Sequence, residues 1–328
     1  MSYNIFSDFI RGKKQICVIQ AENPDGDSLG SALALEEALS EHNVSLYCPV
    51  DIPKYMRYFK GWDRVTHDFD YEADGYIIVD TSSSILLSKL LTNPAIQNSL
   101  QKKSVLIIDH HTTESDLDFP YQAIIKTYPS TCTLLKEILT ANNITISPLC
   151  AELLLYGILS DTLGLSSPTT RPADYRMAAD LLDTGISIAD MEERRREFMK
   201  KSIHVFEYKA DLIKRTEFYL DNRLATVHIP FEDIREYSDE YNPNVLIQEE
   251  LRLVEGVDVS VAIKTYPDGK VTGKIRSNLP IAEQLANFFG GGGHPYAAGF
   301  RTYGYYDDIL NDLISATDKI LLVYGQES

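Results

Sequence analysis

The chain has 328 residues, 44% of them hydrophobic and 24% charged, with a formal net charge of −17. This length predicts two domains, and the acidic balance argues against long duplex DNA, whose binding depends on basic surfaces. No apolar run approaches the ~20 residues needed to cross a bilayer, so we expect no membrane partner. Nothing at the N-terminus is typical of a signal peptide, and four scattered cysteines indicate buried free thiols in a reducing, cytoplasmic setting.

Short apolar runs alternate with helical stretches in the first half, which predicts an α/β fold with a parallel sheet. The two near-continuous apolar runs that end in Asp80 and Asp109 are typical of strands buried on both faces. An amphipathic helix is expected at 28–41, capped by Asp27 or Ser28. Strands are predicted at 16–20, 44–48, 75–80 and 104–109, and a buried helix at 149–160 delivers Asp161 to a turn.

The pattern changes after a long charged stretch at 187–212, which we interpret as one connecting helix. Pro267-Asp268-Gly269 is a strong turn signal between two strand-like runs, 257–266 and 270–277, and predicts a hairpin. A further strand at 224–229 and helices at 281–289 and 306–323 complete a smaller α/β domain. The predicted organisation is an N-terminal domain at 1–186, a helical linker at 187–215 and a C-terminal domain at 216–328.

Acidic and imidazole side chains gather where the predicted strands end. Asp25 and Asp27 follow the first strand, Asp80 and Asp109 end later strands, and His110 comes next. Taken singly, Asp-Gly-Asp also suits a turn and Asp80 a helix cap. Together they fall at the carboxyl edge of one predicted sheet, where open α/β folds place their ligands. Carboxylate and imidazole in that arrangement indicate a divalent metal site.

Four glycines, Gly290 to Gly293, precede His294 and follow an apolar helix. Consecutive glycines let backbone amides converge on an anion, and the histidine can donate to the same anion. In isolation the run is equally compatible with a flexible hinge. A phosphate-binding loop together with a metal site in one chain suggests phosphoester chemistry.

The ordered motifs NPDGDSLGS, IIVDTS, IIDHH, YGILSDT, KIRSN and FFGGGGHPYAAG resemble the DHH phosphoesterase superfamily with the first type of DHH-associated C-terminal domain. More narrowly, the chain is similar to the bacterial oligoribonuclease (nanoRNase) and pAp-phosphatase branch, where pAp is 3′-phosphoadenosine 5′-phosphate. The motifs cover almost the whole chain. The resemblance implies a parallel-sheet DHH domain, a helical linker and a smaller α/β DHH-associated domain.

The resemblance also implies two Mn²⁺ ions. One would be held by Asp27, Asp80, His110 and Asp161. Asp80 would bridge to a second ion bound by Asp25 and by a histidine four residues before Asp25. Two ions ~3.5–4 Å apart would let a bridging water ionise near neutral pH and attack phosphorus in line.

The family pattern gives the remaining roles to both domains. His111 would contact the phosphate or the leaving group, and Asp109 would support the histidines. The substrate's phosphate would be held by Arg276, Ser277, Asn278, Gly291, Gly292, Gly293 and His294.

The chain departs from this pattern at Ala21, which stands where the family has the histidine four residues before Asp25. Alanine cannot ligate a metal, so the second Mn²⁺ site is expected to be weak or empty. A smaller departure follows Asp161, where Thr162 and the apolar Leu163 precede Gly164.

The resulting hypothesis is a Mn²⁺-dependent phosphoesterase acting on short RNA and on pAp, compatible with a homodimer. One alternative is a nucleotide-binding protein whose catalysis is weakened by Ala21. Another is a phosphodiesterase for linear or cyclic dinucleotides.

Overall fold

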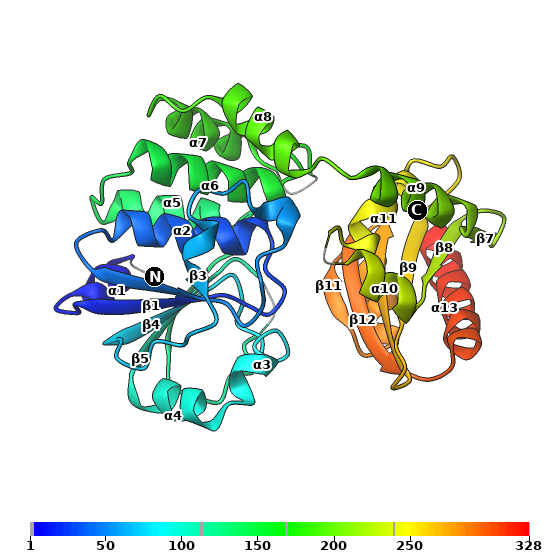
Figure 1. The fold of residues 1–328 in the computed structure, drawn as a ribbon, viewed down its shortest axis with the longest axis horizontal. Coiled ribbons are helices and arrows are strands. Elements are labelled where there is room, and N and C mark those ends of the chain that lie inside the picture. Colours follow the sequence, from blue (N-terminus) through cyan, green and yellow to red (C-terminus); the bar gives the residue numbers. More distant parts are fainter. Residues whose placement is uncertain (1–2, 112–113, 168–169, 239, 328) are drawn as a thin grey trace. The chain divides into compact units, whose positions relative to one another are not determined.

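The computed structural model describes residues 3–111, 114–167, 170–238 and 240–327 (Figure 1). The chain divides into two compact units, Met1–Met199 and Lys200–Ser328. None of the described helices is long and apolar enough to cross a membrane.

The first unit is built on one six-stranded sheet in which every neighbouring pair is parallel. The strand order is β3-β2-β1-β4-β5-β6, so β1, β4 and β5 lie side by side at its centre. Their carboxyl ends therefore meet at one edge of the sheet. The strands are β1 (Gln15–Ile19), β2 (Asn43–Tyr47), β3 (Val65–Thr66), β4 (Gly75–Val79), β5 (Ser104–Asp109) and β6 (Gln122–Ile125).

Helices cover both faces of this sheet (Figure 1). Alternate residues of β1 enter different cores: Ile16 and Val18 pack with α2, α5 and α6, whereas Cys17 and Ile19 pack on the side of α3 and α4. This two-sided burial explains the continuous apolar runs. The helices are α1 (Asn4–Ile10), α2 (Gly26–Ala38), α3 (Ser88–Leu91), α4 (Pro94–Lys102), α5 (Thr131–Ala141), α6 (Pro148–Asp161), α7 (Pro172–Leu182) and α8 (Ile188–Phe198), with 3-10 turns at Lys54–Met56 and Trp62–Arg64.

Helix α2 begins earlier than predicted, and its cap is neither Asp27 nor Ser28. Asp25 is the N-cap, because its carboxylate accepts hydrogen bonds from the amides of Asp27 (3.1 Å) and Ser28 (2.9 Å). The helix is also not amphipathic, since every residue from Gly26 to Leu35 is buried. It lies between the sheet and the helices α5 and α6, so only its last turn, from Glu36, is partly exposed to water.

The predicted single connecting helix is two helices, α8 and α9 (Ile203–Lys214). A new helix begins because the Ser202 side chain accepts from the amide of Val205 and caps α9.

The second unit contains a mixed six-stranded sheet in the order β11-β12-β10-β9-β8-β7. Only β8 and β9 pair in parallel. The predicted hairpin across Pro267-Asp268-Gly269 is confirmed, with Gly269 in the left-handed region (φ +78°). The elements are β7 (Glu217–Tyr219), β8 (Leu224–Ile229), α10 (Phe231–Tyr237), α11 (Pro243–Arg252), β9 (Val259–Thr265), β10 (Lys270–Ser277), α12 (Ala282–Phe288), β11 (Gly292–His294), β12 (Ala297–Tyr303) and α13 (Tyr306–Glu327).

Candidate metal centre and phosphate-binding face

The sheet topology brings the predicted acids of the first unit to one edge. Asp25 caps α2 just after β1, Asp80 directly follows β4, and Asp109 ends β5 with His110 next. Because these strands are adjacent and parallel, their carboxyl ends lie together. The predicted convergence of these residues is present in the structure.

Asp161 comes to the same edge from α6, which packs closely against α2. A Cβ on Gly26 would lie 2.4 Å from Oγ of Ser160, and one on Gly30 would lie 2.8 Å from the carbonyl oxygen of Leu153. Both positions therefore require glycine. Gly26, between Asp25 and Asp27, is thus the contact that lets the end of α6 approach them.

Asp27, Asp80 and His110 offer ligand atoms that all lie within 4.8 Å of one another. Nε2 of His110 is 3.5 Å from Oδ1 of Asp80 and 3.4 Å from Oδ2 of Asp161. Nδ1 of His110 is 2.9 Å from the carbonyl oxygen of Tyr128, which assigns the ring proton to Nδ1. The other ring nitrogen then faces the acids with its lone pair, as in metal-ligating histidines.

The start of α5 fixes two of these carboxylates. The amides of Thr131 and Cys132 donate to Asp27 at 2.5 and 2.9 Å, one to each oxygen. The hydroxyl of Thr131 donates to Oδ1 of Asp80 at 2.9 Å. Asp80 itself has φ +63°, a left-handed conformation uncommon outside glycine, aspartate and asparagine and often found at functional sites.

Within the described residues of the first unit, the cationic group near these carboxylates is the imidazole of His111, whose Nδ1 lies 4.0 Å from Oδ1 of Asp80. Among the described residues, no lysine or arginine lies within 4.0 Å of Asp25, Asp27, Asp80 or Asp161. Burial raises the pKa of Asp80 and of Asp161 well above the ordinary range, and nearby Asp27 and Asp25 raise both further. Three carboxylates crowded around Nε2 of His110, with more negative charge than His111 can balance, are a donor set that fits a divalent cation.

Asp109 positions His111, as the family pattern implies. Oδ1 of the fully buried Asp109 is 2.7 Å from Nδ1 of His111 and accepts the amide of His111 at 3.1 Å. Burial alone would lower the pKa of His111, but this bond and the charge of Asp109 outweigh it and raise it. Burial would likewise raise the pKa of Asp109, and His111 reverses that effect. The pair therefore favours a charged imidazole that is partly exposed.

Ala21 brings no ligand to this edge, and its neighbours do not replace it. Ala21 is buried beyond the end of β1. The carboxylate of Glu22 accepts from the hydroxyl of Ser88 (3.0 Å) and the amide of Lys89 (3.1 Å), so it is engaged at the start of α3. Gln20 is fully buried, and its side-chain oxygen accepts from Ser28 at 3.3 Å.

The extra apolar residue after Asp161 is accommodated by the backbone. Leu163, Gly164 and Leu165 all have positive φ (51°, 70° and 64°), which turns the chain tightly. Thr162 holds the turn, since its hydroxyl donates to the Ile158 carbonyl and accepts from the Leu165 amide. Asp161 remains the last residue of α6.

In the second unit, the side chains of Ser277 and Asn278 stabilise the fold. The Ser277 hydroxyl donates to the carbonyl of Asp258 (3.0 Å), and Nδ2 of Asn278 donates to the carbonyls of Arg252 (3.0 Å) and Val257 (2.8 Å). Arg276 is half-buried on the opposite face of β10 from Ser277. Their predicted contact with substrate stays a prediction.

The glycine run is not a hinge, and not all of its amides are available to an anion. The amide of Gly290 donates to Asn287 (3.0 Å) and that of Gly291 to Ala286 (2.9 Å), so both end α12. Residues Gly292–His294 form β11, which pairs with β12. The predicted convergence of the glycine amides on an anion therefore does not hold for Gly290 and Gly291. Substrate binding by Gly291, Gly292, Gly293 and His294 stays a prediction.

Sequence analysis missed Lys264, a lysine of β9 that is only 8% exposed. Nζ donates to Oδ1 of Asn242 at 3.0 Å, and no carboxylate lies within 4.0 Å among the described residues. Burial lowers the pKa of Lys264 from 10.5 to about 8, and nearby Lys274 lowers it further. The alternation of the strand places Lys264 with Ser260 and Ala262 on one face, and the burial of that face cannot be seen in the sequence.

Lys264→Met is expected to raise the free energy of unfolding at pH 7 by about 1–3 kcal/mol. The gain should vanish as the pH rises from about 8 towards 10.5. In that window the unfolded parent still binds a proton that the folded parent has released, so the parent's own stability increases. Urea unfolding at pH 7, 8.5 and 10 measures this. Lys319→Met, at an exposed lysine of α13, is the control, and an equal gain there would refute the explanation.

Residues 15–158 match the model of the DHH family, N-terminal domain. The first unit carries a DHH domain. A protein from Thermus thermophilus named bifunctional oligoribonuclease and PAP phosphatase NrnA is 28% identical over 306 residues, covering 93% of this chain and 87% of that protein. A manganese-dependent inorganic pyrophosphatase from Methanocaldococcus jannaschii is 26% identical over 263 residues, 76% of this chain and 82% of that one.

The fold also matches a solved structure. An exopolyphosphatase-related protein from Bacteroides fragilis superposes on 97% of this chain and 95% of its own with a TM-score of 0.82, at 20% identity. The α/β class predicted from sequence, with a parallel sheet followed by a smaller α/β unit, is therefore confirmed. The family resemblance seen in the DHH motifs is confirmed as well.

Proposed function

We propose that this protein is a divalent-metal phosphoesterase, using Mn²⁺, that hydrolyses short oligoribonucleotides and pAp. One observation carries the proposal: the DHH domain gathers the carboxylates of Asp27, Asp80 and Asp161 around Nε2 of His110, with no lysine or arginine within 4.0 Å of them among the described residues of the first unit. A bound divalent ion would neutralise phosphate oxygens and make water acidic enough to act as a nucleophile near neutral pH.

The protein's own groups would prepare the reaction. The amides of α5 hold Asp27, and Thr131 holds Asp80, so the ligand oxygens are preorganised. His111, kept charged by Asp109, would donate to a phosphate oxygen or protonate the leaving oxygen. In the second unit, Arg276 would bind a substrate phosphate.

The departure at Ala21 supports a second candidate function. Without a histidine there, Asp25 and Asp80 would hold a second ion only weakly, and the protein would bind nucleotides with little turnover. Metal analysis separates the two: about one tightly held Mn²⁺ and no hydrolysis would favour binding alone. Activity that rises steeply with added Mn²⁺ would favour the enzyme.

Short substrates are expected to be hydrolysed with a kcat/KM at least about 10-fold higher than long RNA, because a net charge of −17 repels an extended polyanion. Hydrolysis of pAp and of RNA dimers to pentamers, measured against a much longer RNA with Mn²⁺ present, tests this. Linear and cyclic dinucleotides assayed in parallel test the third hypothesis. Equal or better activity on the long chain would rule out the proposed substrate class.

A further inference from the structure

The sheet of the second unit has two different faces. In β9, β10 and β12, alternate residues enter the core beneath α12 and α13, among them Val261, Ile275 and Phe300. Directly opposed residues of neighbouring strands share a face. The register Lys264↔Thr272↔Arg301 therefore puts these three on the other face, and Ala262↔Lys274↔Gly299 joins them.

The strand positions of this second face are basic, and α11, which carries Glu249, packs against its β9 and β10 part. Besides Lys264, Lys274 and Arg301 it holds Arg276, which pairs with Ser260 and Ala297. No aspartate or glutamate occupies any of its positions on β9, β10, β11 or β12. In a chain with a net charge of −17, such a segregation of cations marks a local anion-binding surface.

Two cations on this face, the half-buried Arg276 and the exposed Arg301, form no close ion pair among the described residues, although Glu249 acts on Arg276 from a greater distance. Within the part of the chain that the structure describes, Arg276 and Arg301 have no carboxylate within 4.0 Å. Elsewhere in the same unit arginines are paired, as Arg223 is with Asp258 at 2.6 Å. Arginines left without a carboxylate are suited to a ligand phosphate, which they bind in a bidentate manner.

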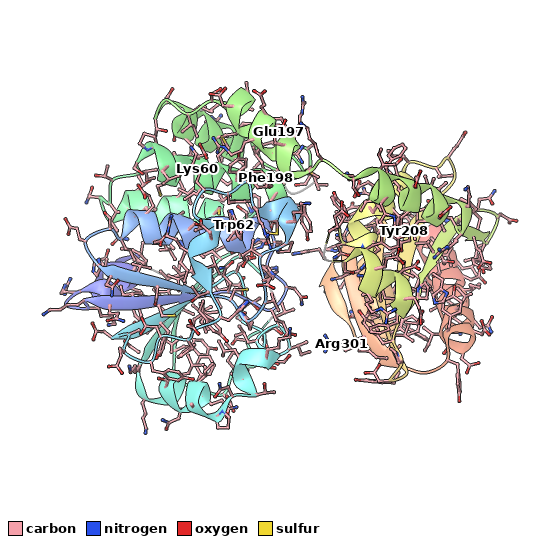
Figure 2. All side chains as sticks on the ribbon, in the orientation of Figure 1. Lys60, Trp62, Glu197, Phe198, Tyr208 and Arg301 are labelled. Atoms are coloured by element: carbon pink, nitrogen blue, oxygen red, sulfur yellow. The ribbon has the colours of Figure 1, made fainter. Side chains whose placement is uncertain are left out.

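Small residues lie between these side chains and leave room for them to extend along the sheet. Gly299 and Ala297 separate Lys274 and Arg276 from the edge strand β11. A Cβ on Gly299 would lie 3.3 Å from Cδ and 3.5 Å from Nζ of Lys274, so the lysine extends over the glycine. Figure 2 shows Arg301, two residues further along β12, leaving the sheet on the side away from α13.

The spacing suits more than one phosphate. Lys274 and Arg276 are two residues apart on one strand, a repeat of ~6.6 Å. Arg301 stands diagonally from Lys274 across the β10–β12 pair, at ~7–8 Å. These intervals are comparable to the separation of successive phosphates in an extended single strand.

We propose that Lys274 and Arg301, on either side of Gly299, form a second phosphate subsite beside Arg276, which binds the next phosphate of a short oligonucleotide. The inference rests on the proposed function, since it extends the phosphate contact expected of Arg276. This face would then select substrates by length, because a ligand with one phosphate contacts Arg276 alone, whereas a dinucleotide contacts both subsites.

Binding without metal tests the proposal separately from catalysis. Titration calorimetry in EDTA compares 5′-AMP with the 5′-phosphorylated dinucleotide pApA. The parent should bind pApA about 10-fold more tightly and with a salt dependence steeper by about 0.7 in log–log slope. Arg301→Gln and Lys274→Gln should each lower pApA affinity about 5- to 10-fold, remove most of the extra slope, and leave AMP unchanged. Arg276→Gln should weaken both ligands.

Lys319→Gln removes one exposed positive charge from α13 and is the matched control. A parent that does not distinguish the two ligands would overturn the subsite. So would an Arg301 variant that binds pApA normally, or one that loses AMP and pApA equally, as general electrostatics predicts. If this binding pattern appears but Mn²⁺ gives no hydrolysis, the proposed function fails and the subsite stands. If the Arg301 and Lys274 variants bind and hydrolyse pApA as the parent does, the subsite is wrong and the proposed function stands.

Discussion

Asp80→Asn is expected to lower kcat/KM for pAp by on the order of 10³-fold or more. Asp80 contacts both His110 and Thr131 through Oδ1, and in the family pattern it is shared by the two metal sites. Asparagine tolerates the left-handed backbone at this position (φ +63°), so the change removes charge and little else.

A second measurement makes the Asp80 prediction independent of activity. In EDTA the variant should unfold at a higher temperature than the parent, because a buried carboxylate that is crowded by Asp27, Asp25 and Asp161 is gone. Added Mn²⁺ should stabilise the parent much more than the variant. Asp183→Asn, at an exposed aspartate after α7, is the control. If Asp80→Asn keeps near-parental activity and the full stabilisation by Mn²⁺, the metal centre is placed wrongly.

Ala21→His is expected to lower the Mn²⁺ concentration needed for half-maximal activity by about 10- to 100-fold. The imidazole would supply Asp25 with the partner ligand that the family pattern has four residues earlier. Because Ala21 is buried, the larger side chain should also destabilise the fold by about 1–3 kcal/mol. Calorimetric titration with Mn²⁺ should show the second binding event becoming tighter.

Ala21→Leu separates ligation from crowding, since it adds bulk without a donor atom. It should be destabilised like the histidine variant and gain nothing in metal affinity. If the two variants respond alike to Mn²⁺, or if Ala21→His matches the parent at every metal concentration, the residue does not account for a weak second site.

The convergence of acids could be predicted because it depends on strand order alone. Apolar runs that end in Asp80 and Asp109 must deliver them to one edge once the strands are parallel neighbours. The boundary of α2 could not be fixed in the same way. Asp25, Asp27 and Ser28 are all able to cap a helix, and only the backbone geometry selects Asp25.

Contacts between segments that are far apart in the chain could not be predicted from sequence patterns. Thr131 donates a hydrogen bond to Asp80, which lies 51 residues earlier in the chain, and the sequence around neither residue indicates this contact. The glycine run suggested free amides, but Gly290 and Gly291 use theirs to end α12. The basic face needs the register of β9, β10 and β12, which places Lys274 opposite Gly299.

The close approach of Gly26 to Ser160 affects both the packing of the core and the geometry of the metal centre. Helix packing in the core and the spread of the ligand oxygens are governed by the same gap, because Gly26 lies between two of the acids and Ser160 immediately precedes a third. Any sequence that loosened α2 from α6 would also draw Asp161 away from its partners. The packing of α2 against α6 in the core therefore also fixes the distances between the oxygens that would hold a metal ion.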